Sequence, residues 1–203
     1  MGVKERRQRE KESLRQEILD AARELFAAEG YDNVSMRKIA EKIEYTPTTI
    51  YLYFQDKAEL LYGICQEMFG ELIQSYSKLG ELEPDPVSAL KRGLRIYIDF
   101  GLSHPNHYKV VFSGMNHNCD FEKRFPFEQS LGHEAFSYLV GIVQACIDQK
   151  VFRPVDVATA SQTIWAALHG LVVLLIDHQD FPWVDREQLI NHLIDTLVNG
   201  LKA

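Results

Sequence analysis

Along most of the chain, hydrophobic side chains recur every three or four residues, which is the period of an α-helix and not of a β-strand. The clearest case is residues 14–29, where apolar side chains share one face and charged side chains occupy the other. The apolar face carries Leu14, Ile18, Ala21, Leu25 and Phe26. Gly30 follows, at a position where a left-handed conformation costs a glycine little. The pattern predicts an amphipathic helix over residues 14–29.

Two short helices are expected next, and each begins at a hydroxyl side chain. Ser35 suits the N-cap position of the first, and Thr46 suits that of the second, where Pro47 follows at the first helical position. The helix that starts at Thr46 should bury Ile50 and Phe54. Only about three residues separate the two helices, which is the connection expected of a helix-turn-helix.

A fourth helix is expected to open at Asp56, because Glu59 follows three residues later as in a variant capping box. It continues without a glycine or proline linker, so the boundary to the next part of the chain should fall near residues 65–75, inside or just after this helix. The two parts would then be mechanically coupled. The expected division is a basic arm, a DNA-binding domain and a ligand-binding and dimerisation domain, over residues 1–13, 14–66 and 67–203.

The remaining hydrophobic pattern predicts helices over residues 86–103, 128–149, 155–178 and 185–201. Residues 104–127, which are dense in His, Asn, Phe, Pro and Gly, form the least regular stretch. The predicted fold class is all-α, with an N-terminal helix-turn-helix domain of three helices and a C-terminal helical ligand-binding and dimerisation bundle.

Composition fits an ordinary soluble globular protein, with 46% hydrophobic and 25% charged residues. No basic segment precedes an apolar one at the N-terminus, so no secretory signal is expected. The longest nearly continuous apolar run, residues 171–176, is too short to cross a bilayer. Three cysteines without paired spacing suggest neither a disulfide framework nor a zinc site. We expect a soluble cytoplasmic protein with no membrane partner.

The net charge of −7 is unevenly distributed. Residues 1–15 contain six cations and three anions, and residues 16–57 contain five cations and eight anions, so the first 57 residues are neutral together. Composition alone therefore gives only weak support to a nucleic-acid partner. Two interpretations of the basic arm over residues 4–15 remain open: a solvated disordered tail, or an arm that enters a DNA minor groove.

The helix that begins at Thr46 offers hydroxyls and phenols on its exposed face, with almost no charge. Such groups hydrogen-bond to phosphates and base edges, and Pro47 and the threonine methyls can lie against a thymine methyl. Lys57, near free backbone N–H groups, would anchor a phosphate. The exposed candidates are Thr46, Thr48, Thr49, Tyr51 and Tyr53. The alternative is that these residues only cap and cover a small helix.

Three segments resemble the DNA-binding signature of the TetR/AcrR family of regulators: Ala27-Ala-Glu-Gly-Tyr31, Val34-Ser-Met-Arg-Lys-Ile-Ala-Glu41 and Thr46-Pro-Thr-Thr-Ile-Tyr-Leu-Tyr-Phe-Gln-Asp-Lys-Ala-Glu-Leu60. The resemblance covers residues 14–62. It implies that Thr46 to Tyr53 form a recognition helix in the major groove, and that a homodimer binds a near-palindromic double-stranded operator. It also implies that Ser35, Arg37, Tyr53 and Lys57 contact phosphates, with Arg37 within reach of a base.

The sequence departs from this family at one turn, where Glu44 stands in place of the usual glycine. A left-handed conformation costs a non-glycine residue about 1–2 kcal/mol. We expect a slightly rebuilt turn and a re-aimed recognition helix, which bears on the operator sequence and not on DNA binding itself.

The C-terminal part resembles the Trp-His-Gly branch of the family, through Ser103-His-Pro-Asn-His-Tyr-Lys-Val-Val-Phe112 and Trp165-Ala-Ala-Leu-His-Gly-Leu171. Trp165 and His169 share a helical face, where they either fill the core or line a pocket. We expect an apolar pocket between residues 90–145 and 160–175 for a small, largely hydrophobic effector. Its candidate lining residues are Tyr97, Phe100, Tyr108, Phe112, Phe136, Trp165 and His169.

The last two predicted helices, 155–178 and 185–201, are candidates for a homodimer interface in which Ala160, Ala167 and Gly170 allow close approach. The alternative is that they only complete the core of one subunit. The leading hypothesis is a repressor that the effector releases from its operator, with the fourth helix as transmitter. A ligand-responsive activator is the alternative.

Other classes of function have little support in the sequence. No nucleophile and base pair, phosphate loop or metal-ligand spacing points to an enzyme, and no cofactor is expected. A helical adaptor without DNA or ligand is a third possibility. A metal site would use His104, His107, His117 and Cys119, which match no compact motif. A redox role for Cys65, Cys119 or Cys146 is comparably weak.

Overall fold

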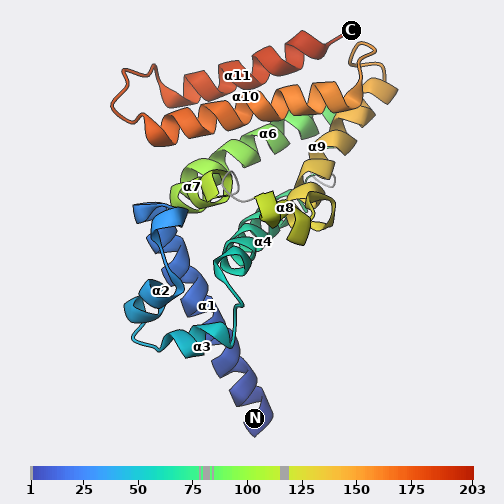
Figure 1. Ribbon diagram of the computed structural model, residues 1–203. Coiled ribbons are helices and arrows are strands. Elements are labelled where there is room, and N and C mark those ends of the chain that lie inside the picture. The colour runs from blue at the N-terminus through green and yellow to red at the C-terminus, as the bar shows by residue number, and fades with distance from the viewer. Residues whose placement is uncertain (1, 78, 80–82, 84, 115–118) are drawn as a thin grey trace. The chain divides into compact units, whose positions relative to one another are not determined.

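A computed structural model describes residues 2–77, 79, 83, 85–114 and 119–203, and within them the chain is built from helices (Figure 1). The only extended pairing in these ranges is an isolated bridge between Phe152 and Lys202. The all-α prediction is therefore confirmed. The helices are α1 (Val3–Glu29), η1 (Tyr31–Asn33), α2 (Met36–Lys42), α3 (Pro47–Tyr51), α4 (Lys57–Tyr76), α6 (Pro86–Ser103), α7 (Pro105–Gly114), α8 (Cys119–Arg124), η3 (Phe127–Gln129), α9 (Leu131–Asp148), α10 (Val157–Asp177) and α11 (Arg186–Leu201).

The chain divides into two compact units. The first comprises the residues up to Met68 together with 106–129, and the second comprises 69–105 with 130–203. The division falls inside α4, so this one helix supplies residues to both units. The segment with α7 and α8 packs with the N-terminal helices, although the sequence grouped it with the C-terminal part. The domain limits proposed from the sequence remain a prediction.

Most of the expected helix boundaries are found where side chains cap them. The Oγ of Ser35 accepts the backbone N–H of Lys38, and Oγ1 of Thr46 accepts that of Thr49. Asp85 caps α6 in the same way, and α6 covers the predicted residues 86–103. Caps satisfy backbone N–H groups that have no partner inside the helix, and this is why these boundaries are readable in the sequence.

The prediction of an irregular segment over residues 104–127 is wrong, because α7 and α8 occupy most of it. These helices are short, and helices of this length are marginal in water by propensity alone. Burial of Tyr108, Val111 and Phe121 stabilises them instead. The many His, Asn, Pro and Gly residues obscured the helical spacing of these apolar positions.

The basic arm is also helical and not a disordered tail, since α1 begins at Val3. Glu5 caps the helix by accepting the backbone N–H of Gly2 at 2.9 Å, and Gln8 donates to Glu12 at 2.7 Å. An α-helix with side chains is about 10–12 Å wide, whereas the minor groove of B-DNA is about 6 Å wide. In this conformation the arm does not fit a minor groove.

In the first unit, α3 is held by two buried side chains, Ile50 and Phe54. Phe54 lies where α1 and α4 approach closely. A Cβ added at Gly63 of α4 would be 2.9 Å from Cδ2 of Leu19 in α1 and 3.6 Å from Cε1 of Phe54. The guanidinium of Arg15 lies over the Phe54 ring, 5.1 Å from its centroid. The end of α3 is therefore clamped between two long helices.

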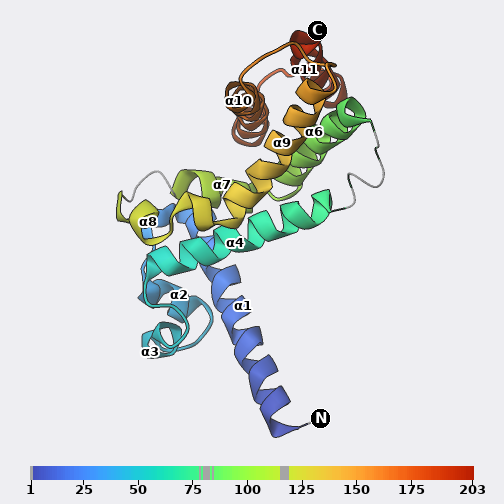
Figure 2. The ribbon, with the colours of Figure 1, turned by 90° about the vertical axis from the view of Figure 1, so that its right-hand side faces the viewer.

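A second clamp joins α8 to the start of α4 (Figure 2). Asp56 accepts the backbone N–H of Glu59 at 2.9 Å, as one half of the predicted capping box requires. Glu59 accepts the N–H of Gln55, one residue before the N-cap, at 2.6 Å. Arg124 of α8 donates to the carboxylate of Asp56 at 2.5 Å and to the amide oxygen of Gln55 at 3.1 Å.

Next to this ion pair, the ring of Phe125 stacks on Tyr62 of α4, with centroids 4.2 Å apart and planes 10° apart. Burial would raise the pKa of the Asp56 carboxyl, but hydrogen bonds from Glu59 and Arg124 and the charge of Arg124 outweigh it and lower the pKa. The carboxylate of Asp56 thus both caps α4 and pairs with Arg124 of α8.

In the second unit, α6, α9, α10 and α11 pack on one another (Figures 1 and 2). Two ion pairs join α11 to α6: Lys91 with Asp195, and Arg95 with Glu187, both at 2.6 Å. By length and composition, α10 is the one helix in the described ranges that is apolar enough to cross a membrane. Core helices of soluble proteins share these properties, so this is weak evidence for a membrane span.

The turn between α2 and α3 contains the strain that the sequence predicts at Glu44, whose φ is +59°. Its N–H donates to the carbonyl of Glu41, and the N–H of Tyr45 donates to that of Ala40, which is the Schellman pattern of a helix C-terminus. We expect Glu44→Gly to raise the free energy of unfolding by about 0.5–1 kcal/mol, after the greater freedom of glycine in the unfolded chain is subtracted. Urea denaturation measures this change.

The matched control is Glu44→Ala, which removes the carboxylate but keeps the Cβ. If the alanine variant gained as much stability as the glycine variant, the charge of Glu44 and not its backbone conformation would be the cause.

The lowered pKa of Asp56 predicts a pH dependence. Because the pKa is lower in the folded state, the carboxylate adds stability above its unfolded pKa and loses that contribution as the pH falls through the folded pKa. Asp56→Asn retains a capping oxygen but does not titrate. We expect it to lower the free energy of unfolding by up to about 1 kcal/mol at pH 7, since the ion pair is partly exposed.

The difference between wild type and Asp56→Asn should narrow as the pH falls from about 5 to about 3. Arg124→Gln should remove the same pH-dependent part of the free energy of unfolding. The double variant Asp56→Asn/Arg124→Gln should be only slightly less stable than either single variant. Additive losses at every pH would show that Asp56 and Arg124 act independently.

Candidate nucleic-acid interface

The short helix α3 presents its exposed face around Thr48 and Tyr51. The side chain of Tyr51 is 53% exposed, while Ile50 beside it is fully buried. The hydroxyls of Thr46 and Thr49 lie 3.0 Å apart, and the Thr46 oxygen also caps the helix. Thr46 and Thr49 therefore hold the start of the helix, and Thr48 and Tyr51 are the hydroxyl side chains that point outward most freely.

Two exposed apolar side chains that were not predicted as contacts lie beside α3. Leu52, which follows α3 directly, is 76% exposed, and Tyr45, which precedes its N-cap, is 43% exposed. Single exposed hydrophobic side chains are common on protein surfaces, so Leu52 is a candidate contact because it adjoins the exposed face of α3. The sequence signal for the exposure of Leu52 is its position two residues after buried Ile50, which puts it on the opposite side of the helix.

The predicted phosphate-contacting residues of α2 lie at its exposed side. Ser35 is committed to its cap, with its Oγ 3.2 Å from the N–H of Lys38. Arg37 is largely exposed and its Nε donates to Glu41 at 2.8 Å, one helical turn away. Such a surface ion pair is weak, so the guanidinium can exchange a carboxylate for a phosphate at small cost.

Lys57 has a structural environment that the sequence did not indicate. Its ammonium donates to the backbone carbonyl of Tyr31 at 2.6 Å and lies over the Tyr31 ring, 4.2 Å from the centroid. Burial lowers the pKa of Lys57, and the charge of Asp32 opposes this. Lys57 therefore fastens the first turn of α4 to η1. Half-buried Tyr53, another predicted contact, follows α3.

In the second unit, four of the predicted pocket residues come together. The indole Nε1 of Trp165 donates to the hydroxyl of Tyr97 at 3.1 Å. The ring of Phe136 meets Trp165 edge-on at 6.1 Å, and the ring of His169 lies 5.7 Å from it. Burial lowers the pKa of His169, which favours its neutral form. Trp165 is still 38% exposed.

The other three predicted pocket residues make ring contacts of their own. Phe100 pairs with His104, with ring centroids 4.6 Å apart. Tyr108 and Phe112 belong to the first unit, and their centroids are 4.6 Å apart as well. The predicted apolar pocket thus draws its candidates from both units, and its existence remains a prediction.

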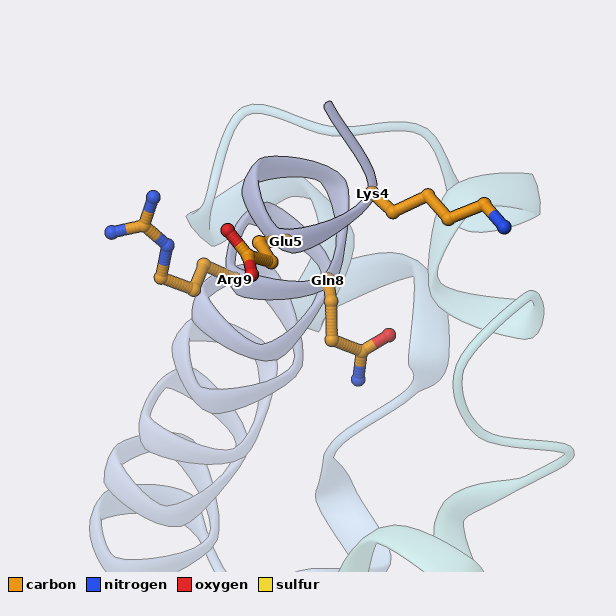
Figure 3. A pocket seen from close by; sticks show the side chains of 4 residues that line it. All are labelled: Lys4, Glu5, Gln8 and Arg9. Carbon is orange, nitrogen blue, oxygen red and sulfur yellow. The ribbon is translucent and has the colours of Figure 1, made fainter. Parts of the chain in front are cut away.

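None of these aromatic residues lines either of two surface depressions. Side chains of α1 alone line the first: Lys4, Glu5, Gln8 and Arg9 (Figure 3). The second lies between α6 and α11, and its cations Lys91, Arg92 and Arg95 are all paired with carboxylates. The first depression is bounded by one helix only, and the second is lined by cations that already pair with carboxylates. Neither resembles a closed site for a hydrophobic effector.

The alternative chemistries gain no support from the described part of the chain. It contains no group of three His, Cys, Asp or Glu side chains placed to hold a metal. His117 lies outside the described residues, and the side chain of Cys119 is not described. Burial raises the pKa of the thiols of Cys65 and Cys146, to about 12 and about 11. Neither is a reactive thiolate near neutral pH.

Comparison with known proteins identifies both parts of the chain. Residues 18–63 match the family described as bacterial regulatory proteins, tetR family. Residues 90–197 match the tetracyclin repressor-like C-terminal domain. The Trp-His-Gly branch that the sequence suggested is not confirmed.

Similar proteins include the fatty acid metabolism regulator protein of Bacillus subtilis, 26% identical over 194 residues, which cover 91% of this chain and 94% of that protein. The transcriptional regulator AcrR of Shigella flexneri is 26% identical over 162 residues, which cover 76% of this chain and 74% of that protein. Among solved structures, FadR of Bacillus subtilis in complex with stearoyl-CoA aligns with a TM-score of 0.78 and 23% identity, over 92% of this chain and 98% of that one.

These matches span most of the chain and agree with the helix-turn-helix and the helical unit that follows it. The proteins matched are transcriptional regulators and not enzymes. The chain belongs to the TetR family of bacterial DNA-binding transcriptional regulators.

Proposed function

We propose that this regulator is a homodimeric cytoplasmic repressor that a small, largely hydrophobic effector releases from a near-palindromic operator. The observation that carries the proposal is the exposed face of α3 with Thr48 and Tyr51, followed by exposed Leu52, while buried Ile50 and Phe54 hold the helix in place. A short helix with a fixed base and an outward face of hydroxyl and apolar groups suits a DNA major groove.

The proposed contacts follow from this geometry. Thr48 and Tyr51 would meet base edges, with Leu52 against a thymine methyl. Arg37 and Tyr53 would bind phosphates, with Ser35, Thr46, Pro47 and Thr49 at the helix N-termini beside them. Lys57 would act mainly as a positioning residue, because its ammonium is already engaged by Tyr31.

The homodimer is supported by the exposed face of α10. Ala166, Gly170 and Leu174 follow one another at helical spacing, Leu174 is 43% exposed, and a Cβ at Gly170 would meet nothing within 4 Å. A face of small and apolar residues allows another helix to approach closely. Ala160, which the sequence suggested for this face, is instead buried in the core of its own unit.

The class of effector is suggested by the relatives. One regulates fatty acid metabolism, and the structurally similar FadR holds stearoyl-CoA. We therefore propose a long-chain acyl-CoA as the first effector to test. Within the second unit, the aromatic cluster of Tyr97, Phe136, Trp165 and His169 would line its apolar part.

Release requires that the effector bind one conformation better than the conformation that fits DNA. The proposed transmitter is α4, since it supplies residues to both units without a break. Its first turn is tied to α8 through Asp56 and Arg124. A shift of α8 would therefore move the start of α4, which directly follows the helix-turn-helix along the chain. An activator, in which the effector favours the DNA-bound conformation, is the alternative.

We expect Tyr51→Ala to weaken binding to a duplex enriched from random-sequence DNA by roughly 5- to 150-fold, the effect of losing about 1–3 kcal/mol of base contact. Binding to an unrelated duplex should stay nearly the same. Fluorescence anisotropy measures both. The matched control is Tyr138→Ala, which truncates an exposed tyrosine of α9 and should change neither affinity. Equal losses on both duplexes would remove Tyr51 from base recognition.

Stearoyl-CoA should bind the protein and lower its affinity for the enriched duplex, whereas coenzyme A alone should do neither. Stearate serves as a third ligand that separates the contribution of the chain from that of the headgroup. Trp165→Ala should weaken the response to the ligand and leave the affinity for DNA without ligand unchanged. Tighter DNA binding in stearoyl-CoA would favour the activator, and no binding would exclude this effector class.

A further inference from the structure

The first three turns of α1 carry a row of cations on one face. Lys4, Arg7 and Lys11 are three and four residues apart, so their side chains lie above one another along the helix. All three are exposed. By the rise of an α-helix, the row extends over about 10 Å.

The face that bears this row is the same face that is buried farther along α1. Continuing from Lys11 at the same spacing leads to Ile18, Ala22 and Leu25, which are in the core of the first unit. Arg15, between the row and the core, lies over the ring of Phe54, just after α3. The row therefore continues the side of α1 that faces the helix-turn-helix. The N-terminal end of α1 extends beyond α3 in both ribbon views (Figures 1 and 2).

The anions of this segment lie on other faces and have partners there. Glu5 caps the helix through Gly2, Glu10 pairs with Arg6 at 3.4 Å, and Glu12 accepts from Gln8. Within the described ranges, no ion pair joins Lys4, Arg7 or Lys11 to a carboxylate. Figure 3 shows Lys4 and Arg9 leaving the helix on opposite sides. By helical spacing, Arg6 and Arg9 lie on the side of α1 opposite the row.

We propose that Lys4, Arg7 and Lys11 contact backbone phosphates of duplex DNA beside the segment that α3 contacts. The inference rests on the proposed function, because it uses the same bound duplex. Charge complementarity argues for this partner: duplex DNA carries one negative charge per about 1.7 Å of its axis, and the row offers cations without apolar side chains among them. A helix is too wide for the minor groove, and the contacts proposed for the row are to phosphates, which position the protein without reading bases.

The test compares two double variants that each remove two cations from the same turns of α1. Arg7→Gln/Lys11→Gln removes them from the row, and Arg6→Gln/Arg9→Gln removes them from the opposite side. Glutamine has nearly the helix propensity of arginine and lysine, and helicity measured by circular dichroism confirms that α1 persists. Affinity is measured from about 50 to about 200 mM salt, on the enriched duplex and on an unrelated duplex of equal length.

The row variant should reduce the slope of log affinity against log salt concentration by about 2 per bound chain, and weaken binding by roughly 10- to 100-fold near 0.1 M salt, on both duplexes. The opposite-side variant should change the slope much less. Ethylation interference should lose its signal at flanking phosphates in the row variant only.

Equal slopes in the two variants would overturn the proposal, because the effect would then be that of bulk charge. This outcome is distinguishable from failure of the proposed function. If the wild-type protein did not prefer the enriched duplex, the operator hypothesis would fail, while the difference in slope on the unrelated duplex would still decide the role of the row.

Discussion

A helix of one turn cannot hold its own direction in water, and α3 contains only five residues. Its direction is therefore set by what it buries. Ile50 and Phe54 provide that burial, and Phe54 lies beside Leu19 of α1 and Gly63 of α4. The proposed contacts of α3 with DNA depend on this packing, since Thr48, Tyr51 and Leu52 point outward only because their neighbours point inward.

The same unit explains how a signal could reach α3. The carboxylate of Asp56 caps α4 and also anchors Arg124 of α8, so the start of α4 cannot move without disturbing α8. Lys57, the next residue, is fastened to the carbonyl and ring of Tyr31. Two consecutive residues thus tie the first turn of α4 to segments on both sides of it along the chain. Such shared anchors favour discrete rearrangement over gradual drift.

Local features of the sequence predicted the helix-turn-helix well, because its information is local. Ser35, Thr46 and Asp56 each accept the N–H of a residue three positions later. The left-handed conformation of Glu44 is likewise fixed by hydrogen bonds within a single turn. The family resemblance then assigned the DNA-binding role, which pattern and charge alone left open.

Features that depend on distant residues were not predictable in the same way. The pair of Asp56 and Arg124 joins residues 68 positions apart, and α7 owes its stability to burial of Tyr108 and Val111. The aromatic residues predicted for the pocket divide between the two units, because Tyr108 and Phe112 belong to the first unit. Helical spacing shows which face is apolar, but it does not show which element covers that face.

The most direct test of the central claim is enrichment of duplexes from a random-sequence DNA pool by the purified protein, followed by sequencing. A dimer that presents two copies of α3 predicts an inverted repeat whose half-site centres are one helical turn of DNA, or a multiple of it, apart. Enrichment of a single unrepeated site would contradict the dimeric arrangement. No enrichment at all would contradict sequence recognition by α3.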